Sequence, residues 1–312
     1  MTTSDIRKLA CEAGFDRAYV LEPAKCERPE INRYNKRVAD DCLEVMEDAK
    51  SVIVLLKAYA PYEQNGNEAQ ISAYYPVSNE AYHAAKALAE KIEEEGYKAL
   101  FNVQIAIKPL LLKTHIGQTG RNSLVSVEGL GTRFHAQIIL TDANLEKDAL
   151  SEKAMVSEMC LHCGECAKKC PSGAIGRNGR VDVDKCLRSR DDGEIVPETL
   201  RKIYANRLLG CDVCQDVCPR NEKGISVPVP EGLKNALSLS ELLKGNVQPL
   251  TPYIGRNYAR RSRIRMKAAL AAANLGRFDL INDLIDMAEN GTEGEKEHAA
   301  WALAALEKNK NV

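Results

Sequence analysis

The spacing of the cysteines in the middle of the chain constrains its fold more than any other feature. Four cysteines and a proline occupy the twelve residues CLHCGECAKKCP, 160–171. Two residues separate each of the first three cysteines from the next, and three residues separate the third from the fourth, which directly precedes Pro171. Thiolates at this spacing bind 4Fe–4S clusters in two-cluster modules, where the fourth cysteine ligates the other cluster. The pattern therefore predicts a second cysteine group further along the chain.

A second group is present at residues 211–219, with the sequence CDVCQDVCP. It has one cysteine fewer than the first group, and Cys186 between the two groups supplies a replacement. If each group gives its last cysteine to the other cluster, all eight cysteines are assigned. The predicted ligands of cluster one are Cys160, Cys163, Cys166 and Cys218, and those of cluster two are Cys170, Cys186, Cys211 and Cys214.

Structural zinc and disulfides are the alternatives to iron–sulfur clusters. Zinc sites usually combine CxxC pairs that are a dozen or more residues apart, whereas three cysteines at successive spacings of two fit a tetrahedron poorly. The N-terminus lacks a secretory signal, so we expect a cytoplasmic protein, in which thiols stay reduced. The other three cysteines, Cys11, Cys26 and Cys42, have no ligand spacing and are predicted to be buried or half-buried thiols.

Length and composition set wide limits. A chain of 312 residues suggests two or three domains, and its hydrophobic content of 45% permits a sizeable core. The net charge of −1 excludes neither a nucleic acid nor a membrane partner, because opposite patches can cancel. No apolar run approaches the roughly 18 residues that a membrane span requires, so no membrane partner is expected.

Hydrophobic patterns predict three parts. In residues 1–152 we expect strands over 51–56, 99–107 and 132–142. We also expect an N-terminal helix capped by Thr3 or Ser4 and a helix over 81–97 that stops at Gly96. This mixture indicates an α/β or α+β domain. Residues 153–225 form the ferredoxin-like two-cluster module, and a proline-rich linker at 225–232 follows. Residues 226–312 are predicted to be helical, with two similar passages roughly 32 residues apart that indicate helical repeats.

Electrons from two clusters need an acceptor, but the familiar cofactor motifs are absent. The chain has no GxGxxG after a strand, no GxxxxGK[ST], and no DxHxxG. The remaining candidate is the loop IGQTGRNSL, 116–124, in which glycines allow close approach of a ligand and polar side chains follow. A plain turn between strands would have a similar sequence. The candidate cofactor-binding residues are Gly117, Gly120, Arg121, Asn122 and Ser123.

The chain resembles the epoxyqueuosine reductase family, the cobalamin-dependent, double-cluster iron–sulfur enzymes of queuosine tRNA modification. The resemblance is carried by AKSVIVLLKAYAPY (49–62), ISAYYPVSNEAYH (71–83), the glycine loop with the strand after it, and most closely by GEIVPETLRKIYANRLLGCDVCQDVCPRN (193–221). It implies two 4Fe–4S clusters, base-off cobalamin near the 117–123 loop, and C-terminal helical repeats of the HEAT-like kind. It also implies tRNA as substrate and an external electron donor such as flavodoxin or ferredoxin.

The sequence departs from the family where a proton donor is expected. Ala106 stands in place of the family's aspartate, with Lys108 and Pro109 following, and Gln137 replaces a strand glutamate. Opening an epoxide requires a general acid, which contributes about 10²–10⁴-fold to the rate. The candidate substitutes are Tyr75, His83 and Lys108, with Tyr82 and His115 as further possibilities. Each of these side chains could equally have a structural role.

The stretch 251–278 carries seven basic residues and no acidic one: Arg256, Arg260, Arg261, Arg263, Arg265, Lys267 and Arg277. In the family this part meets tRNA, so the region 256–277 is a candidate phosphate-binding surface. The alternative is a solvated helix face, or salt bridges to the acidic segment 279–297.

Three hypotheses for function follow. The first is a cobalamin-dependent iron–sulfur reductase that acts on epoxyqueuosine in tRNA. The second keeps the cofactors but changes the substrate to a small organic molecule that is dehalogenated or deoxygenated, because the usual acid is missing. The third is an electron-transfer protein that serves the corrinoid of a partner.

Overall fold

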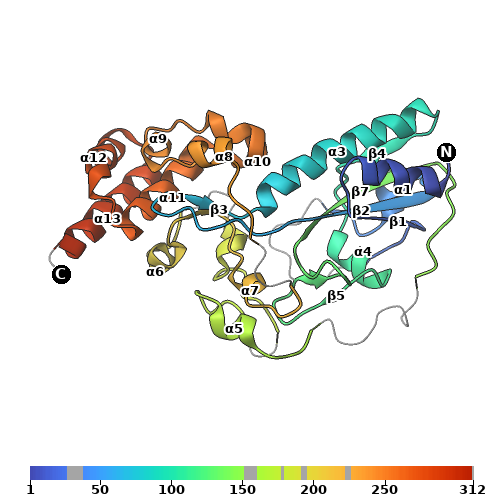
Figure 1. Ribbon diagram of the computed structural model, residues 1–312, viewed down its shortest axis with the longest axis horizontal. Helices are drawn as coiled ribbons and strands as arrows, with labels where there is room; N and C mark the ends of the chain where they lie inside the picture. The colour runs from blue at the N-terminus through green and yellow to red at the C-terminus, as the bar shows by residue number, and fades with distance from the viewer. Residues whose placement is uncertain (27–37, 151–159, 177–178, 191–194, 222–225, 311–312) are drawn as a thin grey trace. The chain divides into compact units, whose positions relative to one another are not determined.

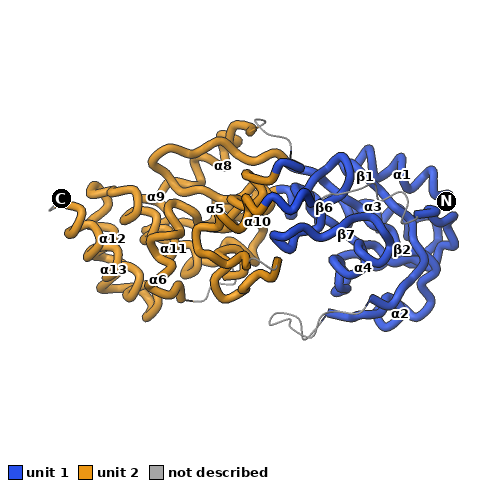
Figure 2. The backbone as a smooth tube through the Cα atoms, turned by 90° about the horizontal axis from the view of Figure 1, so that it is seen from below, with its two compact units in different colours: residues 1–59, 77–163, 219–222 blue, residues 60–76, 164–218, 223–312 orange. Residues whose placement is uncertain are grey.

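The computed structural model describes residues 1–26, 38–150, 160–176, 179–190, 195–221 and 226–310 (Figure 1). The chain forms two compact units (Figure 2). Unit 1 comprises Met1–Tyr59, Val77–Cys163 and Pro219–Glu222, and unit 2 comprises Ala60–Pro76, Gly164–Cys218 and Lys223–Val312. The predicted boundaries near 152 and 225 fall beside residues outside the described ranges, so the three-part division stays a prediction.

Unit 1 is built on an antiparallel sheet with the strand order β1-β2-β7-β4. The strands are β1 (Arg17–Leu21), β2 (Ser51–Ala58), β7 (Phe134–Thr141) and β4 (Ala99–Phe101). Strand β2 is apolar at consecutive positions because both of its faces are covered. Ile53 and Leu55 pack in the cluster that contains α1 (Thr3–Glu12) and α3 (Tyr74–Glu94), whereas Val54 and Leu56 pack in the cluster that contains α4 (Ile107–Lys113).

The helices of this unit follow the sequence signals with shifts at their ends. The cap of α1 is Thr2 rather than Thr3 or Ser4, because the Thr2 hydroxyl accepts from the Asp5 N–H at 3.2 Å and the Asp5 carboxylate accepts from the Thr2 N–H at 2.7 Å. Helix α3 begins at Tyr74, before the predicted start, and its first three residues belong to unit 2. It ends before Gly96, whose φ is 87°.

The predicted strand over 99–107 is wrong beyond its first three residues. Strand β4 ends at Phe101 because Asn102 has a φ of 53°, a conformation incompatible with a strand. The chain then enters α4, where Pro109 lies in the first turn and the lack of an N–H costs no helical bond. The glycine loop after α4 is a hairpin of β5 (Gln118–Thr119) and β6 (Val125–Ser126). A short helix, α2 (Cys42–Val45), completes the unit.

The cysteine-rich part of unit 2 contains short elements: α5 (Glu165–Lys169), η2 (Leu187–Arg190), α6 (Glu198–Arg201), η3 (Lys202–Tyr204) and α7 (Val213–Asp216). Strand β8 (Arg207–Leu209) pairs in parallel with β3 (Gln70–Ile71). This pairing brings a segment from the first quarter of the chain next to the backbone that leads into Cys211.

The rest of unit 2 is helical, as predicted. The helices are α8 (Glu231–Ala236), α9 (Leu239–Leu243), η4 (Gln248–Leu250), α10 (Thr251–Tyr258), α11 (Arg261–Asn274), η5 (Phe278–Leu280), α12 (Ile281–Asn290) and α13 (Glu293–Lys310). Helix α11 is buried on all sides, because it contacts α9, α13 and β8. Its many alanines allow this close packing.

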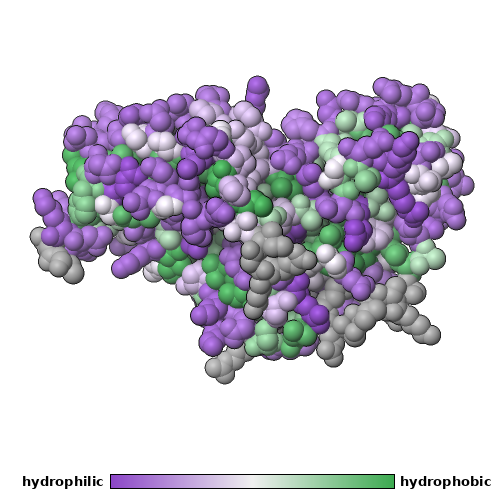
Figure 3. Space-filling model, in the orientation of Figure 1, coloured by the Kyte–Doolittle hydropathy of each residue, from purple (hydrophilic) through white to green (hydrophobic). Residues whose placement is uncertain are grey.

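The mixed α/β character of the fold is confirmed, and the HEAT-like nature of the helices remains a prediction. Among the described helices, none is long and apolar enough to cross a membrane. The face drawn in Figure 3 is mainly hydrophilic. The large apolar side chains that are exposed in the described ranges are Leu43, Leu100, Leu161, Val183, Ile195, Phe278 and Ile285.

Candidate cofactor and iron–sulfur site

The glycine loop of unit 1 is a tight hairpin whose sequence is fixed partly by packing. A Cβ at Gly117 would lie 2.5 Å from Val125 Cγ1 and 2.7 Å from the Ser126 carbonyl oxygen, so only glycine fits. At the tip, the Gly120 N–H donates to the Leu124 carbonyl at 3.0 Å. Gly117 therefore serves the hairpin itself, and the residues available to a ligand are those of the tip.

The polar residues of the tip are held by short-range hydrogen bonds. The Ser123 N–H donates to the Gly120 carbonyl at 2.9 Å, and Ser123 has a φ of 60°. The Asn122 side chain is buried, and its Oδ1 accepts from the Leu124 N–H at 3.2 Å. Arg121, between Gly120 and Asn122 in the sequence, is half-buried. The tip is thus a preformed turn rather than a loose loop.

The first cysteine of the ferredoxin-like pattern lies against this turn. A Cβ built at Gly120 would be 3.8 Å from Cys160 Sγ and 3.9 Å from Cys160 Cβ, which is ordinary van der Waals contact. Both residues belong to unit 1. The structure therefore brings together the predicted cofactor loop and a predicted cluster ligand that are forty positions apart in the sequence.

Lys108 is a second predicted residue that the structure places at the loop. Its Nζ donates to the Ser123 carbonyl oxygen at 2.6 Å, from the first turn of α4. Although the side chain reaches solvent, desolvation by the surrounding protein lowers the pKa of the Lys108 ammonium group. Ala106, which stands where an acid was expected, is the buried residue before α4 and gives the helix no side-chain cap.

The other two predicted catalytic residues, Tyr75 and His83, both belong to α3. Tyr75 is only 2% exposed and belongs to unit 2, where its ring packs against Tyr74 and Tyr258. His83 is exposed on the part of α3 that belongs to unit 1, and its ring lies 5.3 Å from the ring of Tyr82. Lys108 is thus the predicted catalytic residue whose hydrogen bond to the glycine loop is established.

Strand β7 carries a polar pair at the position where the family has a glutamate. The Gln137 amide nitrogen and His135 Nε2 are 3.0 Å apart, and Gln137 is buried. An uncharged amide in this position can be buried at less cost than a carboxylate.

The remaining predicted cluster ligands lie at the ends of short elements. Cys163 belongs to unit 1, and the other six belong to unit 2. Burial raises the pKa of the Cys211 and Cys214 thiols, and nearby Cys186 adds to the effect for both. A raised pKa means that deprotonation of these thiols costs free energy. The positive charge of iron stabilises the thiolates and offsets that cost, so iron fits this set of donors.

The cysteines in the described part of the chain are all free thiols, which argues against the disulfide alternative. Within the same ranges no three metal-ligating side chains could hold a single ion. In a 4Fe–4S cluster each of the four thiolates binds a different iron, so ligands of a cluster need not meet at one point. Of the three cysteines outside the pattern, Cys26 and Cys42 are buried as predicted, whereas Cys11 is exposed at the surface of α1, which corrects the prediction.

Sequence reasoning missed a buried polar pair that holds the segment after the last cysteine. The Thr132 N–H donates to Asn221 Oδ1 at 2.8 Å, and Asn221 Nδ2 donates to Thr132 Oγ1 at 3.0 Å. Both residues lie in unit 1, directly before β7 and shortly after Cys218-Pro219. The only signal was the position of Asn221 in the stretch CPRN.

The structure divides the basic stretch 251–278 into two groups. Arg263, Arg265 and Lys267 are buried in α11, and Arg277 pairs with Glu68 at 2.9 Å and Asp279 at 2.7 Å. Salt bridges to the acidic segment 279–297 are present for Arg277 with Asp279, for Arg265 with Glu295 at 3.0 Å and for Arg261 with Glu295 at 3.9 Å, whereas Glu68 lies outside that segment. The candidate phosphate-binding surface is therefore reduced to the three exposed arginines, Arg256, Arg260 and Arg261.

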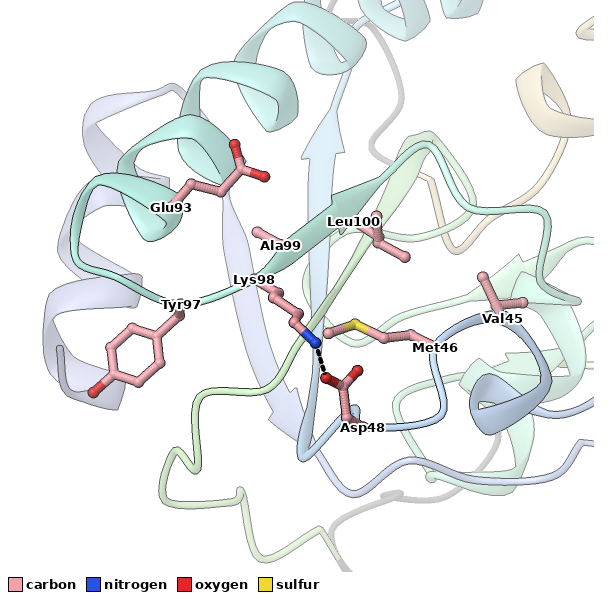
Figure 4. Close-up of a pocket in the computed structure, with 8 residues that line it drawn as sticks. All are labelled: Val45, Met46, Asp48, Glu93, Tyr97, Lys98, Ala99 and Leu100. Atoms are coloured by element: carbon pink, nitrogen blue, oxygen red, sulfur yellow. Dashed lines mark hydrogen bonds and ion pairs between the residues drawn. The ribbon is translucent and has the colours of Figure 1, made fainter.

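A pocket at the free edge of the sheet involves none of the predicted residues (Figure 4). It is lined by residues of β4 and by segments near α2 and the end of α3, and the Lys98 ammonium pairs with the Asp48 carboxylate across it. Because the charged side chains of this pocket are paired with each other, we do not assign the pocket to the cofactor.

Comparisons with known proteins support the double-cluster module. Residues 159–221 match the family described as the 4Fe-4S double cluster binding domain, which contains all eight predicted ligands. The epoxyqueuosine reductase of Aliivibrio fischeri is 33% identical over 177 residues, 53% of this chain and 46% of that protein. The chain thus matches about half the length of that curated relative.

Solved structures show the same fold. Epoxyqueuosine reductase from Bacillus subtilis has a TM-score of 0.78 at 18% identity, over 97% of this chain and 90% of that one. Epoxyqueuosine reductase crystallised with an epoxyqueuosine-modified tRNA-Tyr stem loop has a TM-score of 0.78 at 17% identity, with the same coverage. The chain therefore has the fold of epoxyqueuosine reductases and carries a double-cluster domain over residues 159–221.

Proposed function

We propose that the protein is an iron–sulfur and cobalamin-dependent reductase that converts epoxyqueuosine to queuosine in tRNA. The proximity of Gly120 in the glycine loop to Cys160 carries this proposal, because a Cβ built at Gly120 would lie 3.8 Å from the Cys160 sulfur. The candidate cofactor loop therefore lies beside a candidate cluster ligand. Electrons that leave a cluster at Cys160 would have an acceptor at the loop. An external donor such as flavodoxin or ferredoxin would supply them.

In this proposal the eight cysteines bind two 4Fe–4S clusters in the crossed arrangement given by their spacing, as the family match over 159–221 supports. The corrinoid would be held at the hairpin tip by Gly120, Arg121, Asn122 and Ser123, with Gly117 shaping the turn. When bound, cobalamin supplies a strongly reducing centre that the protein side chains cannot provide.

Lys108 is the proton donor in our proposal. Removal of the epoxide oxygen as water consumes two electrons and two protons and leaves an alkene. The Lys108 Nζ, already directed at the loop by its bond to the Ser123 carbonyl, would give one of these protons to the departing oxygen. Its lowered pKa makes proton release near neutral pH easier than from an ordinary lysine.

The test is corrinoid reconstitution under anaerobic conditions, followed by an assay on tRNA that contains epoxyqueuosine. Lys108→Gln should lower turnover by about 10²–10⁴-fold while leaving corrinoid binding unchanged. Lys113→Gln is the matched control, because Lys113 is on the same helix and its Nζ also donates to a carbonyl, that of Lys25. Failure of the wild-type protein to bind any corrinoid would refute the proposal.

We propose that tRNA binds through the exposed arginines of the 256–277 region, which are Arg256, Arg260 and Arg261. Phosphate contacts of this kind give binding that weakens with salt. Replacement of Arg256 and Arg260 by glutamine should reduce the slope of log affinity against log salt by about one for each arginine. Lys308→Gln combined with Lys310→Gln, at the exposed end of α13, should leave the slope unchanged.

A second candidate function has one specific observation in its favour. Ala106 supplies no acid at the position before α4, so the site differs from the family where the epoxide oxygen would be protonated. A small organic substrate that is dehalogenated or deoxygenated would fit the same cofactors. Turnover of such a compound, with no change in the epoxyqueuosine content of tRNA, would favour this alternative.

A further inference from the structure

Arginine and tyrosine side chains form a stack in unit 2 beside the ligands proposed for cluster two. The Arg188 Cζ lies 3.9 Å from the ring centre of Tyr74 and 5.2 Å from that of Tyr75. The Tyr75 and Tyr258 rings are in edge-to-face contact, with centres 4.8 Å apart. Arginine over an aromatic face is attracted by the ring electrons, more strongly where water is excluded. We call these four residues the Arg188 stack.

The stack contacts the segment that leads into Cys211. A Cβ at Gly210 would lie 2.5 Å from Ser72 Cβ and 3.1 Å from Tyr75 Cε2, and Gly210 has a φ of 82°. The Ser72 N–H donates to the Leu209 carbonyl at 3.0 Å, which extends the pairing of β3 with β8. The backbone beside a proposed ligand is therefore pressed directly against the Tyr75 ring.

The stack is also joined to the segment that carries Cys186. Arg188 follows this cysteine by two residues, in η2. The position of η2 is fixed by Leu187, which is 2% exposed and whose carbonyl accepts from the Tyr204 hydroxyl at 3.3 Å. The guanidinium group is thus held over the Tyr74 ring, on a residue two positions from a proposed ligand.

We propose that the Arg188 stack raises the reduction potential of cluster two. This inference rests on the cluster assignment of the proposed function and assigns Tyr75 a positioning role. Reduction adds one electron to the cluster, so a nearby fixed positive charge stabilises the reduced form. The Tyr74 and Tyr75 rings lie beside the guanidinium group and reduce the screening of its charge by water. A higher potential lets cluster two accept an electron from a milder donor.

The experiment is an anaerobic redox titration of the loaded protein, followed by electron paramagnetic resonance. Arg188→Gln should lower the midpoint potential of cluster two and leave that of cluster one unchanged. Arg188→Lys keeps the charge and should restore most of the wild-type potential. Lys185→Gln is the control, because Lys185 directly precedes Cys186, but its side chain is 60% exposed and its charge is paired with Asp182 at 3.3 Å.

Cys186→Ser assigns the signals, since it should alter the cluster-two signal alone. If both signals survive this change intact, the ligand assignment of the proposed function is wrong. If the assignment holds but Arg188→Gln leaves the cluster-two potential at the wild-type value, the inference about the stack is overturned. Equal shifts of both clusters would also overturn it, because they would indicate a general disturbance of the fold.

Discussion

Removal of Arg265 should destabilise the helices of unit 2 strongly, although the residue lies in the basic stretch that first suggested RNA binding. The Arg265 and Glu295 side chains are 3% and 0% exposed, and Arg265 Nη1 lies 3.0 Å from Glu295 Oε2. Arg265 Nε also donates to the Leu243 carbonyl at 2.6 Å, at the end of α9. This single side chain therefore links α9, α11 and α13.

Replacement of Arg265 by methionine would leave the Glu295 carboxylate buried without its main partner. Breaking a buried pair on one side costs about 3–5 kcal/mol. The lower end applies here, because Glu295 Oε2 still accepts from the Thr292 N–H at 2.9 Å. A loss of ~3 kcal/mol corresponds to a fall in melting temperature of ~6–12 °C for a unit of this size. Arg265→Met combined with Glu295→Met removes both charges and should recover most of that loss.

The assay is anaerobic thermal unfolding of the cluster-loaded protein, followed by circular dichroism. Arg256→Met serves as the control, because Arg256 is exposed and its loss should change stability by less than about 0.5 kcal/mol. If Arg265→Met melts within the range of this control, the buried pair does not stabilise the unit. A double variant that melts no higher than the Arg265→Met single would show that the cost does not come from the stranded carboxylate.

Two further outcomes are expected. Gly117→Ala should destabilise unit 1 by about 1–3 kcal/mol in urea unfolding, since its Cβ would lie 2.7 Å from the Ser126 carbonyl oxygen. Gly120→Ala should destabilise it less, since the nearest atom to that Cβ is the end of the Asn122 side chain, at 3.1 Å. Burial lowers the pKa of His298, whose neutral Nε2 accepts from the Val196 N–H at 3.2 Å. The contribution of His298 to stability should therefore be fully present above pH ~6.5. Below that pH, the free energy of unfolding should fall by up to ~1.4 kcal/mol per pH unit. Melting curves between pH 7.5 and 5.5 should show a smaller slope for His298→Gln.

The sequence predicted the cluster module because ligand spacing is local chemistry. Successive spacings of two place thiolates on one turn of chain whatever surrounds them, and the family match over 159–221 confirms the module. The glycine loop was also found, because Gly117 and Gly120 mark a turn. A plain turn and a cofactor loop have similar local sequences, and the proximity of Cys160, forty positions away, is contained in no local pattern.

The basic stretch shows why the charge pattern was less informative. Arg263, Arg265 and Lys267 have the residue types of a phosphate-binding surface but are buried in α11. Their burial depends on partners distant in sequence: Glu295 for Arg265, and the Tyr204 ring, 4.9 Å from Lys267 Nζ. Charged residues in a helix with apolar residues on all sides give no amphipathic pattern to read. Only the tertiary packing separates these side chains from the exposed Arg256 and Arg260.

The surroundings of the clusters are determined by contacts outside the cysteine motif. Three of these contacts occur at glycines next to cysteine-bearing segments: Cys160 lies against Gly120, Asn221 against Gly131, and Tyr75 against Gly210. In each case a Cβ would occupy or narrow the space that the neighbour fills. Because cluster potential depends on nearby charge, hydrogen bonds and solvent access, these neighbours influence what the clusters can reduce. The cysteines therefore define the ligands, whereas the glycine contacts define the environment in which the ligands work.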